Sequence, residues 1–449
     1  MSEPAAAARE RPRRRFLVAL AVVAAFAFAV RIAWVLAVAA HYALGHDALF
    51  YRAGGVALAA GHGYVNSWYI VHPPVTAQFP PLFTTYLGVF AWLFGDSRLV
   101  AHVAVCLAGT AVVVCTGLLG RKVAGDQVGI VAATVAAVYP GLVVPDGSLM
   151  AETLFTLVVI ASVLVAYRVH ERPTLPAWTL LGMLLGLATL TRGEGVLLVP
   201  LLIGPLIASR ARVPLRVVGG ASVAVVACVL VLVPWTVRNY ETFHHPVLLA
   251  DDSGTLVRGA NCSSAYGGRL LGSWDALCDI NPGIHQSTNE AVEASRELHA
   301  GVHYASTHLW RVPVVVAARL GRTFGLFRPV QEVRLGTSEG RPFGAGLMAW
   351  IAFFALAPFA VIGAWAIRGR GVYWAPLAAV VAMVVLTSVL SYGNTRFGVA
   401  MQPVVVVFAA IAFVHLFGTT RDRLRRTARP SRTPPDDTED VALGAATRE

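Results

Sequence analysis

Charged residues are scarce in this chain, and their scarcity excludes an ordinary soluble protein. Aspartate, glutamate, lysine and arginine make up 14% of the 449 residues, and hydrophobic residues make up 56%. Soluble domains carry about 25% charged residues. The net charge of +11 does not indicate a nucleic-acid partner, because the arginines gather at both termini and in short loops between apolar runs. That distribution is typical of cytoplasmic loops of membrane proteins, so the composition predicts an integral membrane protein.

The motifs of several enzyme classes are missing as well. The chain has no Walker loop, no glycine-rich dinucleotide motif after a strand and no HExxH pair. Nucleotide-dependent and zinc-protease chemistry therefore have no support in the sequence. An enzyme that works outside the cytosol would lack nucleotide donors in any case, which favours a donor carried by a lipid.

Cysteine is rare, with five in the chain. Cys106, Cys115 and Cys228 lie in apolar segments, where we expect them to pack. Cys262 and Cys278 lie in the one long polar loop, and we favour a disulfide between them, which would place that loop outside the cytosol. Metal ligation by two cysteines without nearby histidines is the weaker alternative.

Long apolar runs, in contrast, are plentiful. They lie near residues 16–40, 79–95, 99–120, 126–145, 153–168, 176–191, 194–209, 214–235, 343–367, 372–391 and 398–418. A helix needs about 20 residues to cross a bilayer, so we predict an all-α polytopic membrane protein with about 10–11 transmembrane helices. The predicted parts are a cytoplasmic disordered tail (1–15), an N-terminal module (16–235) that includes a first outer loop (41–78), a large outer loop (236–342), C-terminal helices (343–418) and a second cytoplasmic tail (419–449).

The basic residues between these runs set the expected topology. They all lie on the cytoplasmic side if residues 79–120 cross the membrane only once. Residues 79–95 would then lie at the membrane interface, or enter the membrane and return to the same side. Seven crossings then precede the large loop and three follow it. The acids and arginines that interrupt the apolar runs would all fall outside, where loops could enclose an active-site cavity. Within the large loop, residues 311–328 carry too many arginines to span, so we expect an interfacial amphipathic helix there.

Two carboxylates are candidates for chemistry. Asp47, just past the first apolar run, could accept a proton as a general base at the mouth of an outer cavity, or it could be an ordinary acid at a helix end. His46, Tyr51 and Arg52 could share one face of a short helix with it. Glu152 opens a later helix, where an acid is favoured by the helix dipole, or it could be a second carboxylate that orients the acceptor.

Several arginines are candidates for binding a phosphate. Arg396, flanked by Tyr392 and Asn394, would lie outside, against the usual charge bias, and a phosphate partner would explain it. A lipid headgroup or a loop acid is the alternative partner. The same interpretation applies to Arg238, and to Arg319 and Arg322, which could both face a lipid phosphate. We expect Arg192 and Glu194 to pair with each other, and Arg31, inside the first apolar run, to reach the interface or to have a partner.

Taken in order, these features resemble a known family. The chain has a first helix, then Asp47 with a nearby tyrosine, a Gly-x-Gly-Tyr stretch at 61–64, a Pro-Pro-Leu helix start at 80–82, an acid after the fourth apolar segment, and Tyr-x-Asn-x-Arg at 392–396. This order resembles the GT-C superfamily over about residues 16–418. More narrowly, it is similar to the bacterial branch related to protein O-mannosyltransferases and to the aminoarabinose transferase of lipid A.

The resemblance implies transfer of a sugar from a polyprenyl-phosphate donor to a hydroxyl of a glycan, lipid or protein. It maps the family's first-loop acid to Asp47, its second outer-loop acid to Glu152 and its late phosphate-binding arginine to Arg396. Two departures stand out. Residues 79–81 are Phe-Pro-Pro where the family often has His-Pro-Pro, and Ala48 follows Asp47 where true protein mannosyltransferases have an Asp-Glu pair.

We therefore predict an inverting glycosyltransferase that acts on the outer face of the cytoplasmic membrane. Its partners would be the lipid-linked donor, the acceptor and the bilayer. A divalent metal is conceivable between Asp47 and Glu152, but the sequence indicates no metal site. A transporter or flippase is the alternative function, although the polar interruptions gather at one face and no repeat is visible. A scaffold for the outer loop would tolerate replacement of Asp47, Glu152 and Arg396.

Overall fold

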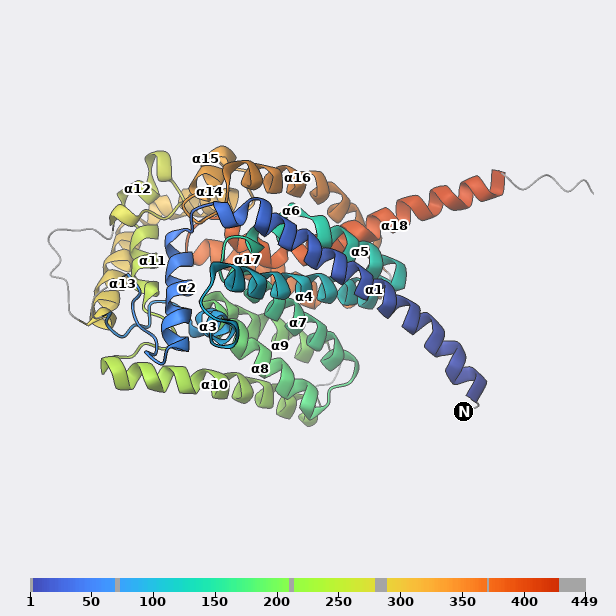
Figure 1. Cartoon of the computed structure of the whole chain (residues 1–449), viewed down its shortest axis with the longest axis horizontal. Helices are drawn as coiled ribbons and strands as arrows, with labels where there is room; N and C mark the ends of the chain where they lie inside the picture. Colours follow the sequence, from blue (N-terminus) through green and yellow to red (C-terminus); the bar gives the residue numbers. More distant parts are fainter. Residues whose placement is uncertain (1–2, 69–72, 210–213, 279–288, 370, 428–449) are drawn as a thin grey trace, which may run out of the picture.

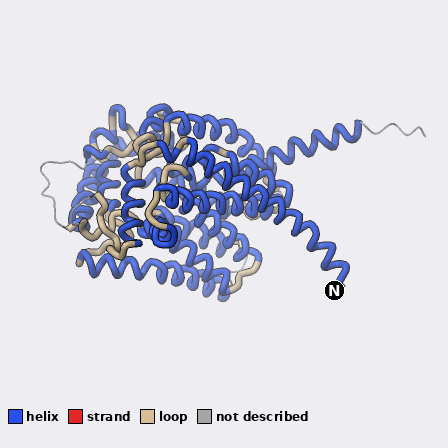
Figure 2. Tube along the Cα trace, viewed as in Figure 1, coloured by secondary structure: helices blue, strands red, loops and turns tan. Residues whose placement is uncertain are grey.

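The protein was analysed as a computed structural model that describes residues 3–68, 73–209, 214–278, 289–369 and 371–427. The described residues are almost entirely helical and form no strand beyond one isolated bridge between Val65 and Val75 (Figure 2). The helices before the large loop are α1 (Glu3–Ala37), α2 (His46–Ala59), α3 (Pro81–Phe94), α4 (Arg98–Ala124), α5 (Asp126–Val138), α6 (Pro140–Asp146), α7 (Glu152–Glu171), α8 (Leu175–Thr191), α9 (Leu198–Ala208) and α10 (Leu215–Phe243).

The remaining helices come from the large loop and the C-terminal part. They are α11 (Asp252–Ala260), α12 (Ser263–Tyr266), α13 (Glu290–Thr307), α14 (Val312–Thr323), α15 (Pro329–Leu335), α16 (Phe343–Ala366), α17 (Ala375–Leu390) and α18 (Gln402–Thr427). Two 3-10 turns, η2 (Gly193–Leu197) and η6 (Thr395–Met401), lead directly into α9 and α18.

Six helices of the described chain are long and apolar enough to cross a membrane, namely α1, α4, α7, α10, α16 and the η6–α18 helix. A seventh crossing would be the α5–α6 pair, which bends by 50° where Pro140 begins α6. The predicted all-α polytopic fold is confirmed. The predicted 10–11 crossings further require that the shorter apolar helices α8, α9 and α17 span. α3, with 14 residues, is shorter than a spanning helix needs to be.

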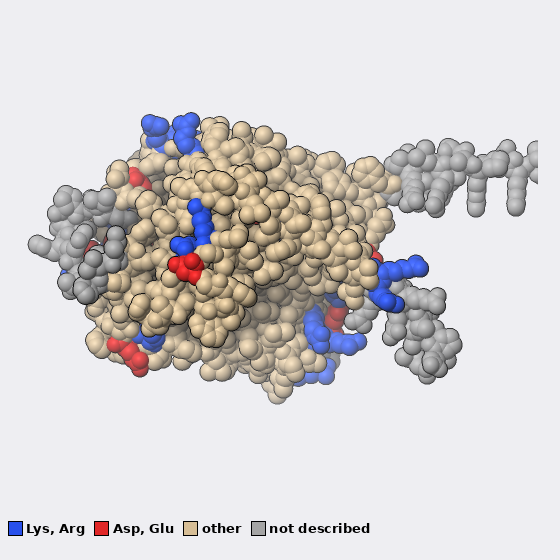
Figure 3. Space-filling model, viewed as in Figure 1, with Lys and Arg blue, Asp and Glu red and all other residues tan. Residues whose placement is uncertain are grey.

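The two ends of the helical bundle differ. The N-terminal end of α1 and the far end of α18 leave the bundle at one end, whereas α2, α11 and α13 lie at the other (Figure 1). A salt bridge between Lys122 and Glu171 joins the ends of α4 and α7. A broad band without charge separates the charged side chains near the two ends of the face seen in Figure 3, as expected where a protein contacts hydrocarbon.

One ion pair is buried inside the bundle. The Nε atom of Arg31 lies 2.6 Å from Oδ2 of Asp146 in α6, and both side chains are almost fully buried. Arg31 also donates to the carbonyls of Ala27 and Ala137, and Thr153 donates to Asp146. Of the two expected outcomes for Arg31, the structure has the one with a partner. The pair fixes α1 against α6, because separating it would leave an uncompensated charge in the protein interior.

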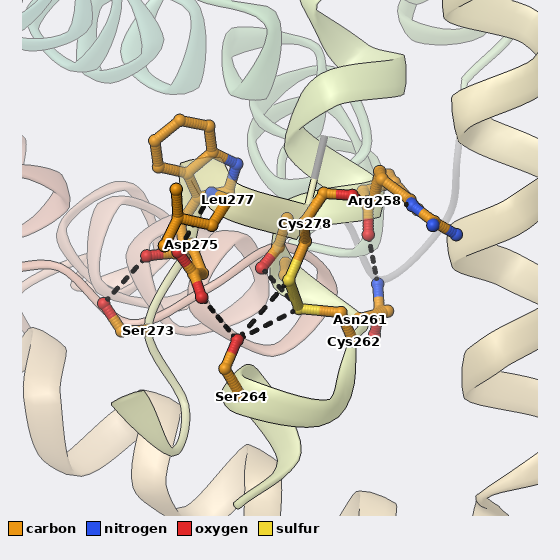
Figure 4. The surroundings of a disulfide bond; sticks show 12 residues. Arg258, Asn261, Cys262, Ser264, Ser273, Asp275, Leu277 and Cys278 are labelled. Atoms are coloured by element: carbon orange, nitrogen blue, oxygen red, sulfur yellow. Dashed lines mark hydrogen bonds between the residues drawn. A yellow bond between two sulfur atoms is a disulfide. The ribbon is translucent and has the colours of Figure 1, made fainter. Parts of the chain in front are cut away.

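The large loop folds into a cap of short helices over one end of the bundle. A disulfide joins Cys262 to Cys278 there, beside Arg258, which donates to the Cys278 carbonyl (Figure 4). α14 lies within the segment where an interfacial helix was expected. The disulfide-closed loop reaches the C-terminal helices, because the amide of Gly393 donates to the Gly272 carbonyl over 2.8 Å. The cap therefore braces the turn that precedes Arg396.

Candidate active site

Asp47 lies in the first turn of α2, and its surroundings are set by a close approach of two segments. A Cβ atom on Gly45 would lie 2.4 Å from the carbonyl oxygen of Ser338, so only glycine lets the chain before α16 pass this near to the start of α2. Gly340, with φ at +79°, turns the chain at the same point. This packing brings Glu339 to the side of Asp47.

Arg396 is the centre of the site. Its Nη1 atom lies 3.3 Å from Oδ2 of Asp47 and 3.5 Å from Oε1 of Glu339, and its Nε atom lies 3.1 Å from Oε1 of Glu152. The side chain is only 14% exposed. Asn394 fixes the turn, because its side chain accepts from the Arg396 amide at 3.0 Å and donates to Glu339 at 2.8 Å. Asp47 and Arg396, 349 positions apart, therefore meet.

A second arginine extends this network. Arg192, at the end of α8, lies 2.8 Å from Oε1 of Glu152 and 2.5 Å from Oε1 of Glu194. The expected pairing of Arg192 with Glu194 is present, and Glu152 joins it. The other carboxylate oxygen of Glu152 is buried and makes no hydrogen bond within the described chain. Oε1 of Glu152 thus contacts both arginines, whereas Oε2 can accept a hydrogen bond from a further partner.

The sequence reasoning did not single out Glu339, which completes the cluster. Burial alone would raise the pKa of this carboxyl, but the guanidiniums of Arg341 and Arg396 hold the pKa at about 2. Glu339 is therefore ionised at neutral pH. It orients Arg396 and balances part of its charge.

The cluster opens onto a large cavity of about 590 Å³. Tyr51, Tyr392 and Arg396, among the predicted site residues, line it, as do Arg192 and Glu194. The cap contributes the loop before α11 and one face of α13. Glu152 and Glu339 lie beside a small neighbouring pocket that shares Arg396 with the large one. Arg396 therefore lies between the large cavity and the inner carboxylates.

Two residues expected beside Asp47 point elsewhere. Arg52 forms an ion pair with Asp96 near the start of α4, and His46 is exposed and lies against the ring of Trp68, with ring centroids 5.5 Å apart. The reason is helical geometry, since Asp47 and Tyr51 are four residues apart and share a face, whereas positions 46 and 52 fall on other faces. Neither His46 nor Arg52 is among the residues that line the large cavity.

Arg319 and Arg322 also differ from expectation. Arg319 donates to the carbonyls of Val389 and Ala260. Arg322 pairs with Glu332 and donates to the Leu271 carbonyl. Both side chains are buried. Their guanidiniums are turned into the protein, so the expectation that they face a lipid phosphate was wrong.

Replacement of Arg319 should therefore affect the fold and not donor binding. We expect Arg319→Met to lower the free energy of unfolding by about 1–3 kcal/mol, because buried carbonyls lose their donor. The KM for the lipid-linked donor should stay unchanged in the folded fraction. Thermal unfolding in detergent and donor titration measure the two effects, with the exposed Arg334→Met as control. An altered donor KM at unchanged stability would restore the phosphate-binding role.

Arg238 has a structural position as well. It donates to the carbonyls of Thr76 and Tyr64 and lies 4.9 Å from the centre of the Trp235 ring. These contacts fasten the first outer loop to α10. Arg238 does not line the large cavity, so the structure does not bring it together with Arg396.

The described residues of the site do not form a ligand set for a metal ion. Among the residues that the structure describes, no three histidine, cysteine, aspartate or glutamate side chains are placed to hold one. Asp47 and Glu152, the pair considered for a divalent metal, both lie beside the guanidinium of Arg396.

The chain matches known proteins in part of its sequence and in its overall structure. Residues 78–237 match the sequence profile of the dolichyl-phosphate-mannose-protein mannosyltransferase family. Among curated protein sequences, none matches this chain.

The overall structure is similar to the oligosaccharyltransferase AglB from Archaeoglobus fulgidus in complex with an inhibitory peptide and a dolichol-phosphate. The TM-score is 0.57 at 14% identity, over 94% of this chain and 53% of that chain. The same archaeal enzyme in complex with zinc and sulfate gives a TM-score of 0.53 at 15% identity, over 91% and 50% of the chains. A weaker likeness, with a TM-score of 0.44 at 15% identity and coverage of 93% and 81%, is to ArnT from Cupriavidus metallidurans bound to undecaprenyl phosphate. The chain spans about half the length of the archaeal enzyme.

Proposed function

We propose that this chain, which has the GT-C fold, is an integral membrane glycosyltransferase that moves a sugar from a polyprenyl-phosphate donor to a hydroxyl acceptor. The acceptor oxygen attacks the anomeric carbon of the sugar, and its proton passes to the carboxylate of Asp47. The bond between that carbon and the phosphate oxygen breaks, and polyprenyl phosphate leaves with the bonding electrons. Attack opposite the leaving phosphate inverts the anomeric centre.

The contact between Asp47 and Arg396 is the observation that carries this proposal. A base and a fixed cation lie 3.3 Å apart, and Arg396 lines a cavity large enough for substrates. The reaction needs a base for the acceptor proton and a fixed positive charge for the departing phosphate. A phosphate leaving group needs little protonation at neutral pH, so no matched general acid is required. Glu152 beside Nε and Glu339 beside Nη1 hold Arg396 in place.

The position of the cavity supports an extracytoplasmic site. The cavity is lined in part by α11 and α13 of the cap, and these helices lie at the end of the bundle away from the N-terminal end of α1 and the far end of α18 (Figure 1). The arginine-rich segments near residues 13–15 and 421–426 belong to the terminal end and are expected inside by the charge bias. A site on the opposite side would have access to lipid-linked sugars and not to nucleotide sugars. We therefore place the reaction on the outer face of the cytoplasmic membrane.

Reconstitution tests the function against its alternative. The purified chain is placed in lipid vesicles with radiolabelled polyprenyl-phosphate mannose and a panel of glycan, lipid and peptide hydroxyls. Arms with Mg²⁺, with Mn²⁺ and with a chelator test the metal. We expect covalent transfer of label to an acceptor without any ion gradient. Movement of label across the membrane without covalent transfer would contradict the proposal and support a transporter or flippase.

A further inference from the structure

Arg192 has a hydrogen-bond donor that its two ion pairs do not use. Its Nε atom contacts Glu194, and its Nη1 atom contacts Glu152. Its third nitrogen, Nη2, has no hydrogen bond or ion pair to any residue that the structure describes, and it is not among the enclosed polar atoms of the described chain that lack a partner. Arg192 lines the large cavity. Nη2 is therefore accessible and can donate to a ligand that occupies this cavity.

Arg396 is placed in the same way. Its Nη1 atom lies beside Asp47 and Glu339 and its Nε atom beside Glu152, whereas Nη2 has no partner within the described chain. Oε1 of Glu152 lies 2.8 Å from Nη1 of Arg192 and 3.1 Å from Nε of Arg396. Because both nitrogens contact one oxygen atom, the two guanidiniums lie side by side. Both arginines line the same cavity, so the cavity wall has two neighbouring fixed cations.

Helix N-termini offset the acids around these arginines. Asp47 lies in the first turn of α2, Glu152 in the first turn of α7 and Glu194 in the first turn of η2. The N-terminus of a helix carries roughly half a positive charge, which stabilises a carboxylate without the use of an arginine. The turns η2 and η6 also begin the helices at 193–208 and 395–417. The site therefore keeps positive charge for an anion despite its carboxylates.

We propose that Arg192 is a second donor-binding residue of the glycosyltransferase. Its Nη2 atom donates to a non-bridging oxygen of the phosphate that links the sugar to the polyprenyl chain, beside Nη2 of Arg396. This inference rests on the proposed function, which supplies the phosphate. An arginine suits this role, because its planar guanidinium donates from several nitrogens at once and keeps its ion pairs while it binds phosphate.

The two arginines contribute at different stages of the reaction. Asp47 lies 3.3 Å from Nη1 of Arg396 and becomes neutral when it takes the acceptor proton. Arg396 then has one carboxylate fewer beside it, so its attraction for the phosphate rises as that group leaves. Glu152 and Glu194, the acids beside Arg192, take no part in the proton transfer. Arg192 therefore binds the phosphate equally before and during the reaction, and such uniform binding lowers KM without changing kcat.

Donor binding and donor kinetics with the full chain test this role. Binding of radiolabelled polyprenyl phosphate to the protein in nanodiscs gives a Kd without turnover, and transfer from polyprenyl-phosphate mannose gives KM and kcat. Arg192→Gln should raise the Kd and the donor KM roughly 10–100-fold, as loss of a hydrogen bond to a charged group does. The kcat at saturating donor should stay within about threefold of the wild type. Arg192→Lys should recover part of the affinity, because it keeps the positive charge.

A double variant separates phosphate binding from folding. Glu194 pairs with Arg192, so Arg192→Gln alone leaves a carboxylate without this cation. Arg192→Gln combined with Glu194→Gln removes both charges and should recover most of the thermal stability in detergent, whereas the Kd for polyprenyl phosphate should stay raised. The control is Arg121→Gln, which breaks an ion pair with Asp126 at the C-terminal end of α4 and should leave Kd, KM and kcat unchanged.

The role of Arg192 would be overturned by an unchanged Kd in the folded double variant, or by a kcat that falls while Kd and KM stay unchanged. Displacement of polyprenyl phosphate by phosphatidylglycerol as readily as by unlabelled polyprenyl phosphate would also overturn it, because the site would then bind any anionic lipid. A wild type that binds polyprenyl phosphate but transfers no sugar would instead contradict the proposed function, and the Kd of the variants would still decide the role of Arg192.

Discussion

Asp47→Asn is expected to lower kcat for sugar transfer by roughly 10²–10⁴-fold, the usual contribution of a general base. Asparagine has nearly the same shape and can still accept a hydrogen bond from Arg396, but it cannot take the proton of the acceptor hydroxyl. The donor KM should change by no more than a few fold. Radiolabel transfer by purified protein in vesicles measures both constants.

The matched control for this variant is Asp96→Asn. Asp96 pairs with Arg52, which belongs to the same helix as Asp47, but it is not among the acids that pair with Arg396. Its replacement should leave transfer intact. Near-normal transfer by Asp47→Asn would remove Asp47 as the base, whatever the position of its side chain.

Arg396→Gln is expected to lower kcat/KM by roughly 10²–10³-fold, as loss of a preorganised charge that stabilises a developing anion does. It should also weaken the fold, because Asp47, Glu152 and Glu339 would share a buried site without their central cation. Removal of one partner from a buried pair costs about 3–5 kcal/mol. Donor titration, transfer rates and thermal unfolding in detergent separate the two effects.

A second substitution separates catalysis from folding. Arg396→Gln combined with Glu152→Gln removes one positive and one negative charge, so it should recover much of the thermal stability. Transfer should stay as low as in the single variant. Arg52→Gln, which breaks an exposed ion pair at the same end of the protein, serves as the control. An unchanged donor affinity and rate in folded Arg396→Gln would exclude the phosphate role of this arginine.

The helices could largely be predicted from the sequence, because apolar runs of membrane length leave few alternatives. The resemblance to the GT-C superfamily is also confirmed by the family match and the shared fold. Hydropathy did not predict where the helices end. α10 was expected to end near residue 235 but continues to Phe243, since the apolar pattern reports where the surroundings change and not where the helix ends. The 126–145 run likewise contains the bend before Pro140.

Part of the site could be predicted from the sequence for a physical reason. Asp47, Glu152 and Arg396 each interrupt an apolar run, and a charge in that setting needs a partner. Their common location followed from the expected topology. Glu339 lacked this signal, because it lies in a polar loop where an acid is ordinary. Its role depends on the close approach of Ser338 to Gly45, which no local pattern indicates.

The arginine assignments failed for a related reason. The sequence places Arg319 and Arg322 on one helix face but does not say what that face contacts. The structure covers it with carbonyl oxygens of the cap and of α17. Buried carbonyls need donors, and an arginine supplies several. Spacing alone cannot distinguish this use of arginine from phosphate binding.

A double-mutant cycle tests most directly whether Asp47 and Arg396 serve one reaction in one cavity. The kcat/KM for sugar transfer is measured for the wild type, Asp47→Asn, Arg396→Gln and the double variant. Residues that act as a unit lose their effect together, so the double variant should transfer sugar within about threefold of the poorer single variant. Losses that multiply, as they do for independent sites, would show that the two residues act separately and would contradict the account.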